Sequence, residues 1–129
     1  MPAPNAREWI RYDVTDGIGE PFIVLSYNIL SDRLATAQMY GYCPTWALNW
    51  DTRRDEILKE IRDADADLIC LQEVEAGQFD DFFMHHLGEH YRLGEHYDGV
   101  FWPKSRAKTM HDHERKVVDG CAIFFRKSV

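Results

Sequence analysis

LICLQEV, residues 68–74, is a short apolar run that ends in an amide and a carboxylate, Gln72 and Glu73. Its four consecutive apolar residues predict a strand that is buried on both faces. A segment over residues 53–63 precedes it, in which Ile57, Leu58 and Ile61 form one apolar stripe of an amphipathic helix. A helix followed directly by a buried strand is typical of an α/β sandwich, which is the fold class that we predict.

The remaining elements are predicted from the same periodicities. FIVL at residues 22–25 indicates a second strand that is buried on both faces, and Thr52 is expected to cap the 53–63 helix, with Asp55 in capping-box position. We also expect a short helix near 35–39, a helix over 77–88, a short strand over 100–102, a polar loop over 104–117 and a last strand over 120–125. Residues 1–20 are interpreted as a lead-in and residues 21–129 as one domain.

Bulk composition excludes some classes of protein. The chain has 129 residues, of which 45% are hydrophobic, which is enough for one core, and it contains no apolar run of membrane-spanning length. Its net charge of −7 argues against a broad nucleic-acid-binding surface, although an enzyme can hold phosphates through a bound metal. Three widely spaced cysteines favour a reducing compartment, the cytoplasm or also the nucleus, and Cys70 and Cys121 are expected to be small core residues.

Asn28 and Glu73 are the candidate catalytic residues, because each follows an apolar run that is predicted to be a strand. Catalytic carboxylates on α/β scaffolds tend to lie where a buried strand meets a loop. Oxygen side chains also suit Mg²⁺, which retains several water ligands. The plainer alternative is that Asn28 forms a turn and that Glu73 is only solvated. The histidines match no closed zinc pattern.

Two further segments have an open interpretation. The basic run KSRAK, residues 104–108, places Lys104 and Arg106 where they could contact phosphates, but a charged loop is often merely solvated, and acidic neighbours such as Asp119 weaken the case. The aromatic run YGYCPTWALNW, residues 40–50, could stack on bases or pack against the sheet, and we expect packing.

Taken in order, five strings in this chain closely resemble the endonuclease/exonuclease/phosphatase superfamily. They are FIVLSYNIL (22–30), YGYCPTWALNW (40–50), DLICLQEV (67–74), PKSRAK (103–108) and VDGCAIFF (118–125). Within that superfamily they look like the catalytic domain of the carbon-catabolite-repression-type mRNA deadenylases. LQEV alone is shared across the superfamily, whereas the combination of the aromatic run with PKSRAK and DGCAIFF is more specific.

The resemblance implies a four-layer α/β sandwich with a Mg²⁺-dependent phosphodiester hydrolase site. Asn28 and Glu73 match family residues of the metal site, so Glu73 is expected to bind Mg²⁺ directly. Asn28 is expected to bind a phosphate oxygen or to orient a ligand, and removal of Glu73 is expected to abolish activity. Later family elements lie beyond Val129, so we expect an N-terminal portion of the domain that exposes an apolar sheet face and an unpaired edge.

The implied function is Mg²⁺-dependent 3′→5′ removal of mRNA poly(A) tails, with this portion expected to be inactive alone. The implied partners are poly(A) RNA and, in the full-length protein, the other subunits of a deadenylase complex, with no membrane. Two alternatives remain open at this point. One is a nucleotide phosphodiesterase or phosphatase of the same superfamily, and the other is a truncated product without catalysis.

Overall fold

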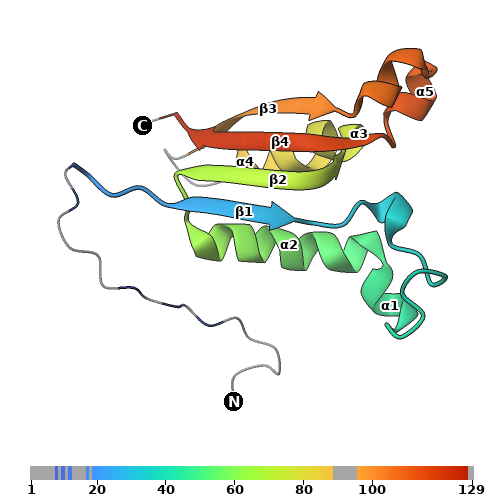
Figure 1. Cartoon of the computed structure of the whole chain (residues 1–129), viewed down its shortest axis with the longest axis horizontal. Helices are drawn as coiled ribbons and strands as arrows, with labels where there is room; N and C mark the ends of the chain where they lie inside the picture. The colour runs from blue at the N-terminus through green and yellow to red at the C-terminus, as the bar shows by residue number, and fades with distance from the viewer. Residues whose placement is uncertain are drawn as a thin grey trace.

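The computed structural model describes residues 8, 10, 12, 17, 19–88 and 96–127. These residues form a four-stranded sheet with the order β1-β2-β4-β3 (Figure 1). The strands are β1 (Val24–Asn28), β2 (Leu68–Glu75), β3 (Tyr97–Pro103) and β4 (Asp119–Arg126). β1 runs parallel to β2, and β4 is antiparallel to both of its neighbours. A mixed sheet with helices between its strands confirms the predicted α/β class.

The long helix between β1 and β2 is α2 (Trp50–Ala64), preceded by the single turn of α1 (Thr45–Leu48). It confirms the helix predicted over 53–63 but begins earlier, because the Asn49 side chain accepts a hydrogen bond from the Asp51 backbone N–H at 2.9 Å. The expectation that Thr52 caps this helix was therefore wrong. Asp65 ends the helix in the left-handed region, at φ 48°.

A continuous helical segment follows β2 and confirms the helix predicted over 77–88. It consists of α3 (Ala76–Gln78), the π-helical turn η2 (Phe79–Phe83) and α4 (Met84–Leu87). The other helical turns are η1 (Asp32–Leu34), η3 (Ser105–Thr109) and α5 (Asp112–Arg115). The expected helix near 35–39 is absent, and the expected loop over 104–117 contains two short helical segments.

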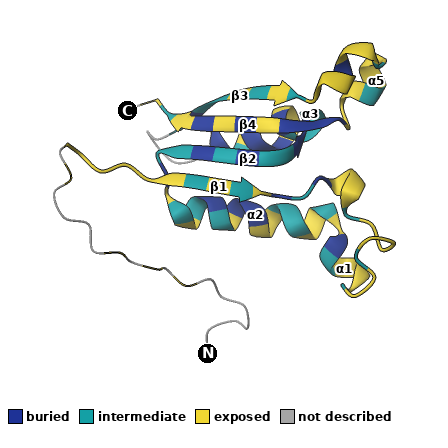
Figure 2. Ribbon diagram, in the orientation of Figure 1, coloured by how far each residue is buried: buried dark blue, intermediate teal, exposed yellow. Residues whose placement is uncertain are grey.

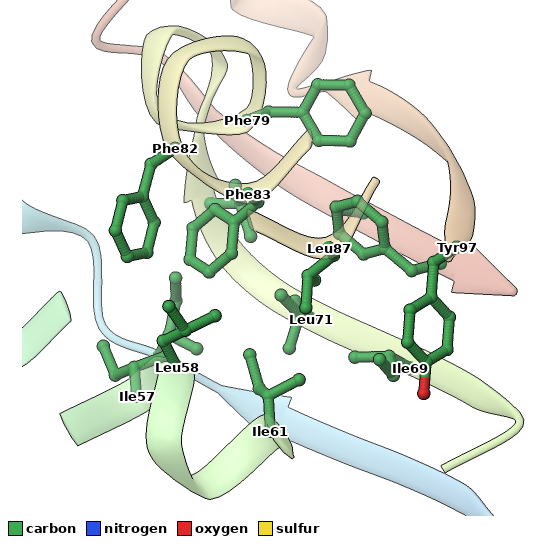
Figure 3. Packing of buried hydrophobic residues seen from close by; sticks show 14 of the residues in the cluster. Ile57, Leu58, Ile61, Ile69, Leu71, Phe79, Phe82, Phe83, Leu87 and Tyr97 are labelled. Atoms are coloured by element: carbon green, nitrogen blue, oxygen red, sulfur yellow. The ribbon is translucent and has the colours of Figure 1, made fainter. Parts of the chain in front are cut away.

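The helix α2 and the helical segment from α3 to α4 cover the same face of the sheet and enclose one core. Figure 3 shows Leu58 and Ile61 of α2 pointing toward Phe83 and Leu87 of the second helical segment, with Leu71 of β2 beneath them. These five side chains are at least nine-tenths buried. Burial of this apolar stripe supplies the main stabilising free energy of such a layer, about 1.5–3 kcal/mol for each large side chain.

The opposite face of the sheet is open to solvent in the part of the chain that the structure describes (Figure 2). β4 alternates buried and exposed residues, and Trp102 of the neighbouring β3 is 77% exposed. The prediction that residues 22–25 and 68–71 are buried on both faces was therefore wrong. Cys121 is exposed and Cys70 half-buried, so neither is the core residue that we expected. The expected apolar sheet face is present.

This open face predicts measurable self-association. Val100 and Ile123 are paired across β3 and β4, and both are exposed. We expect Val100→Thr combined with Ile123→Thr to raise solubility and to lower the mean mass in sedimentation or light scattering, because threonine keeps the strand propensity but removes apolar surface. Val117→Thr, at an exposed residue outside the sheet, is the matched control. Equal association of all three proteins would contradict this interpretation.

The aromatic run of residues 40–50 divides into two groups. The Trp50 ring packs edge-on against the rings of Phe82 and Phe83, with centroids 5.8 and 6.3 Å away, as expected. Tyr42, 85% exposed, and Trp46 lie on the surface, so the expected packing was wrong for these two.

Most of the lead-in predicted for residues 1–20 lies outside the described residues, and the boundary at residue 21 stays a prediction. Among the residues that the structure describes, no helix has both the length and the apolar character to cross a membrane.

Candidate functional site

Asn28 and Glu73 meet at the carboxyl end of the parallel pair β1–β2. Asn28 pairs in register with Gln72, and its Nδ2 donates a hydrogen bond to Glu73 Oε1 at 3.0 Å. Asn28 Oδ1 accepts a hydrogen bond from the Leu30 backbone N–H at 3.0 Å. The Ser31 backbone N–H donates to the second oxygen, Glu73 Oε2, at 3.1 Å. The two predicted site residues are therefore in direct contact, and both carboxylate oxygens accept a hydrogen bond.

Glu73 lies on a β-bulge inside β2, and the expectation that it follows the end of the strand was wrong. Leu71 pairs with Ala122 and Val74 with Gly120, so one residue of β4 lies opposite both Gln72 and Glu73. Glu73 has a φ of 59°, in the left-handed region. For a residue other than glycine this conformation costs about 1–3 kcal/mol and is concentrated at functional sites. The bulge re-aims the Glu73 side chain while β2 continues to Glu75.

A groove of about 540 Å³ lies beside this bulge and brings a second predicted residue to the site. It is lined by Gln72, Glu73, Trp102, Pro103, Lys104, Ser105, Asp119, Gly120 and Cys121. Glu73 and Lys104 therefore border the same concave surface. Arg106 is not among the lining residues, but it contacts Asp119, which is.

Asp119 holds both predicted basic residues. Its side chain is 3% exposed, and its Oδ2 lies 2.8 Å from Lys104 Nζ while its Oδ1 lies 3.0 Å from Arg106 Nη2. The Lys104 backbone N–H also donates to the Asp119 carbonyl at 3.1 Å. Sequence reasoning treated Asp119 only as a neighbour that weakens the basic character of the loop. In the fold it is the buried anion that fixes where the two half-exposed cations lie.

Glu75 is a second buried carboxylate that sequence reasoning missed. It is 5% exposed and lies opposite Asp119 in the β2–β4 pair. Burial is the main cause that raises the pKa of Glu75 above its ordinary value of 4.5, and the charges of Asp32 and Asp119 act in the same direction. Hydrogen bonds from the backbone N–H groups of Arg33 and Asp32 oppose this shift. The alternation of Glu73 and Glu75 along β2 was the only available signal in the sequence.

The raised pKa of Glu75 predicts how stability changes with pH. Above pH 4.5 the folded chain retains the Glu75 proton more strongly than the unfolded chain, so the free energy of unfolding falls as pH rises through the folded-state pKa. We expect Glu75→Gln, which cannot ionise, to make this decline shallower and to raise stability at neutral pH relative to the parent chain. Urea unfolding from pH 4.5 upward measures it, with exposed Glu56→Gln as control. An unchanged slope would show that Glu75 does not titrate as described.

The residues of the site fit a hydrated divalent cation that is held by one carboxylate. The described residues contain no group of three or more His, Cys, Asp or Glu side chains that could hold a metal ion. Each Glu73 oxygen accepts one hydrogen bond and retains a further lone pair, and Mg²⁺ is commonly bound through one or two carboxylates with several waters. Glu73 can therefore act as a ligand without breaking either of its hydrogen bonds.

The family of this chain follows from comparison of its sequence with known protein families. Residues 25–129 match the Endonuclease/Exonuclease/phosphatase family, so the chain belongs to this family. This confirms the resemblance that was inferred from the five strings of sequence.

Two relatives indicate which members of the family this chain resembles. The chain is 52% identical, over 99% of its length, to a CCR4-Not complex 3′-5′-exoribonuclease subunit Ccr4 from Mycosarcoma maydis, and covers 20% of that protein. It is 53% identical, over 93% of its length, to CCR4-NOT transcription complex subunit 6-like-B from Xenopus laevis, and covers 21% of it. The chain thus spans about a fifth of the length of these relatives.

A solved structure with a similar fold is that of ANGEL2, described as a 2′,3′-cyclic phosphatase. The two superpose with a TM-score of 0.63 at 36% sequence identity, over 83% of this chain and 27% of that one. This similarity agrees with the family assignment.

Proposed function

We propose that this chain contributes the Asn28–Glu73 part of the active site of a Mg²⁺-dependent 3′→5′ exoribonuclease that removes mRNA poly(A) tails. The observation that carries the proposal is the contact between Asn28 and the bulged Glu73 at the carboxyl ends of β1 and β2. The names of two similar relatives support the reaction class, because one of them is described as a 3′-5′-exoribonuclease subunit.

In this proposal Glu73 is the catalytic carboxylate that binds the metal. A bound divalent metal would neutralise charge on the phosphoryl oxygens and lower the pKa of a water nucleophile. Asn28 directs one Glu73 oxygen through its Nδ2, and because the amide is neutral it does not repel an anionic substrate. Its Oδ1 accepts the Leu30 N–H and one Nδ2 N–H donates to Glu73, so we assign Asn28 to orienting Glu73, and its second Nδ2 N–H can donate to a phosphate oxygen.

Lys104 and Arg106 are proposed to contact the RNA backbone. Each side chain is about half exposed, and Asp119 holds both near the groove that Glu73 borders. Two cations fixed by one buried carboxylate present N–H donors in a restricted direction, which suits phosphate oxygens. The overall acidic chain would then contact RNA through a small patch rather than through a broad basic surface.

The proposed partners are poly(A) RNA and subunits of a deadenylase complex, because two relatives are named as subunits of the CCR4-Not or CCR4-NOT complex. A cytoplasmic location, with a nuclear one in addition, belongs to the same proposal. The structural neighbour that is described as a 2′,3′-cyclic phosphatase supports a second candidate, a phosphatase that acts on RNA ends.

The test uses a chimera in which this chain replaces the matched segment of the Mycosarcoma maydis Ccr4 relative. We expect the chimera to trim a 3′-A-tailed, 5′-labelled RNA in the presence of Mg²⁺, and the Asn28→Ala/Glu73→Ala double variant to leave it intact. The same proteins are offered an RNA that ends in a 2′,3′-cyclic phosphate. Trimming that survives the double substitution would overturn the proposed site, and conversion of only the cyclic phosphate would favour the phosphatase.

The chain by itself is assayed beside the chimera. Trimming by the isolated chain that is lost on Asn28→Ala/Glu73→Ala would show that these 129 residues assemble a complete site, against the expectation that they are inactive alone. Trimming by the chimera without trimming by the isolated chain would agree with that expectation.

A further inference from the structure

Arg53 of α2 forms several hydrogen bonds near the Asn28–Glu73 pair, two of them with the turn that follows β1. Its side chain is 14% exposed. Its Nη1 donates hydrogen bonds to the carbonyl oxygens of Ile29 at 2.9 Å and of Leu30 at 3.0 Å, and its Nε donates to the Leu48 carbonyl at 3.3 Å. The guanidinium also lies over the Trp50 ring, 5.5 Å from its centroid. One side chain thus joins the start of α2 to the turn that follows β1.

The peptide group between Leu30 and Ser31 connects Arg53 to Glu73. Its carbonyl oxygen accepts the hydrogen bond from Arg53 Nη1, and its N–H donates to Glu73 Oε2 at 3.1 Å. A peptide group is planar and rigid, so holding its oxygen from one side also fixes the direction of its N–H on the other. A cation on the carbonyl polarises the group and makes the N–H a stronger donor to the carboxylate.

The backbone of this turn needs such support. Leu30 has a φ of 59°, a left-handed conformation that a leucine rarely adopts. The Leu30 N–H donates to Asn28 Oδ1, and the Leu30 carbonyl oxygen accepts from Arg53. Side chains therefore hold the peptide groups on both sides of Leu30. Without these bonds the turn would relax toward negative φ and would carry the Ser31 N–H away from Glu73.

We propose that Arg53 is a positioning residue for Glu73, acting through the single peptide group of Leu30 and Ser31. This inference rests on the proposed function in its assignment of Glu73 as the metal ligand. The Ser31 N–H occupies one lone pair of Glu73 Oε2, as Asn28 Nδ2 does for Oε1, and together they leave the remaining lone pairs in a defined direction. An arginine is required because its planar fork reaches three carbonyl oxygens, whereas a lysine is a point charge.

The variants are Arg53→Lys, Arg53→Gln and, as the matched control, Arg54→Gln. Arg54 is the next residue on α2, is 41% exposed and forms its closest ion pair with Asp51, at 3.2 Å, away from the turn. Amide hydrogen exchange measured by NMR on the 129-residue chain gives the rate at Ser31 and, as a check on folding, the rates through α2. Paramagnetic broadening by Mn²⁺ around residue 73 gives the metal affinity.

We expect Arg53→Lys and Arg53→Gln to speed Ser31 exchange at least about tenfold and to weaken Mn²⁺ binding by about 10- to 100-fold, the usual range for a partner that orients a metal ligand. Exchange in the middle of α2 stays unchanged, and Arg54→Gln changes neither quantity. Ser31 exchange and Mn²⁺ binding that stay at the parent values in both Arg53 variants would overturn the proposal, as would an equal effect of Arg54→Gln.

A double-mutant cycle separates positioning from a general structural role. If Arg53 acts on Glu73 through Ser31, the change in Ser31 exchange caused by Arg53→Lys shrinks in a Glu73→Ala background, because that substitution has already removed the acceptor of the Ser31 N–H. An undiminished change in that background would mean that Arg53 only supports the loop, and would overturn the proposal. Failure of the parent chain to bind Mn²⁺ would count against the proposed function alone, since the cycle is read from Ser31 exchange.

Discussion

Glu73→Gln in the chimeric exoribonuclease is expected to lower the rate of A-tail removal by at least about 100-fold, more than the loss of a residue that only orients a ligand. The amide has the size of the carboxylate and can still accept a hydrogen bond from Ser31 or Asn28, but it carries no charge to hold a divalent cation. The rate is measured on labelled A-tailed RNA at saturating Mg²⁺, and circular dichroism checks the fold.

The control for this result is Glu56→Gln, which removes the same charge from an exposed position on α2. A Glu73→Gln enzyme that keeps more than a tenth of the parent rate would remove Glu73 from the catalytic site. If Glu56→Gln lowered the rate as much as Glu73→Gln does, net charge, and not the position of the carboxylate, would decide the rate.

The strained backbone at Glu73 gives a companion measurement on the isolated chain. Glu73→Ala keeps a side chain in the left-handed region and loses both hydrogen bonds, whereas Glu73→Gly loses the same bonds without the steric conflict. We expect the glycine variant to be more stable than the alanine variant by about 1 kcal/mol in urea unfolding, at the low end of the cost of this conformation. A glycine variant that is less stable than the alanine variant would mean that the bulge is not strained, because only the greater chain entropy of glycine would then separate the two.

Simultaneous Lys104→Met and Arg106→Met exchange is expected to lower the free energy of unfolding by about 2–3 kcal/mol. Both cations of the buried Asp119 carboxylate are then gone, and Glu75 lies opposite it in the sheet. Breaking a buried pair by removing one sign of charge costs about 3–5 kcal/mol, and we place the loss below that range because the two cations are half exposed and screened. Urea unfolding at neutral pH measures it.

Two further variants test whether the isolated charge of Asp119 causes this loss of stability. Lys108→Met removes an exposed cation from the same loop and is expected to change stability by less than about 0.5 kcal/mol. Adding Asp119→Asn to the double variant removes the uncompensated charge and is expected to restore most of the loss. Absence of that recovery would show that the two methionine side chains, and not the isolated carboxylate, cause the destabilisation.

Local patterns in the sequence were sufficient for the fold class and for the two central residues of the site. The stripe of Ile57, Leu58 and Ile61 predicted α2, because periodicity is a property of neighbouring residues. Asn28 and Glu73 were identified because polar oxygen side chains followed apolar runs. The catalytic roles of Asn28 and Glu73, and the substrate-binding roles of Lys104 and Arg106, stay predictions until the variants above are measured.

Other features depend on partners that are distant along the chain. The bulge that turns Glu73 exists only because β4 pairs with β2 on both sides of it. One-sided burial of the sheet, which contradicted the predicted strands, depends on which layers pack against each face. The same apolar run suits a sheet that is covered on one face and a sheet that is covered on both faces, so composition cannot distinguish the two cases.

The supporting contacts of the site were decided by tertiary structure alone. Ser31 and Glu73 are separated by 42 residues, and Arg53 lies 24 residues from Ile29. Asp119 reaches Lys104 and Arg106 because β3 and β4 return side by side. The sequence by itself determined which side chains have the chemistry of the site. The packing of α2 and β4 around β2 determined how those side chains are held, because hydrogen bonds of this kind require directions that only the assembled backbone defines.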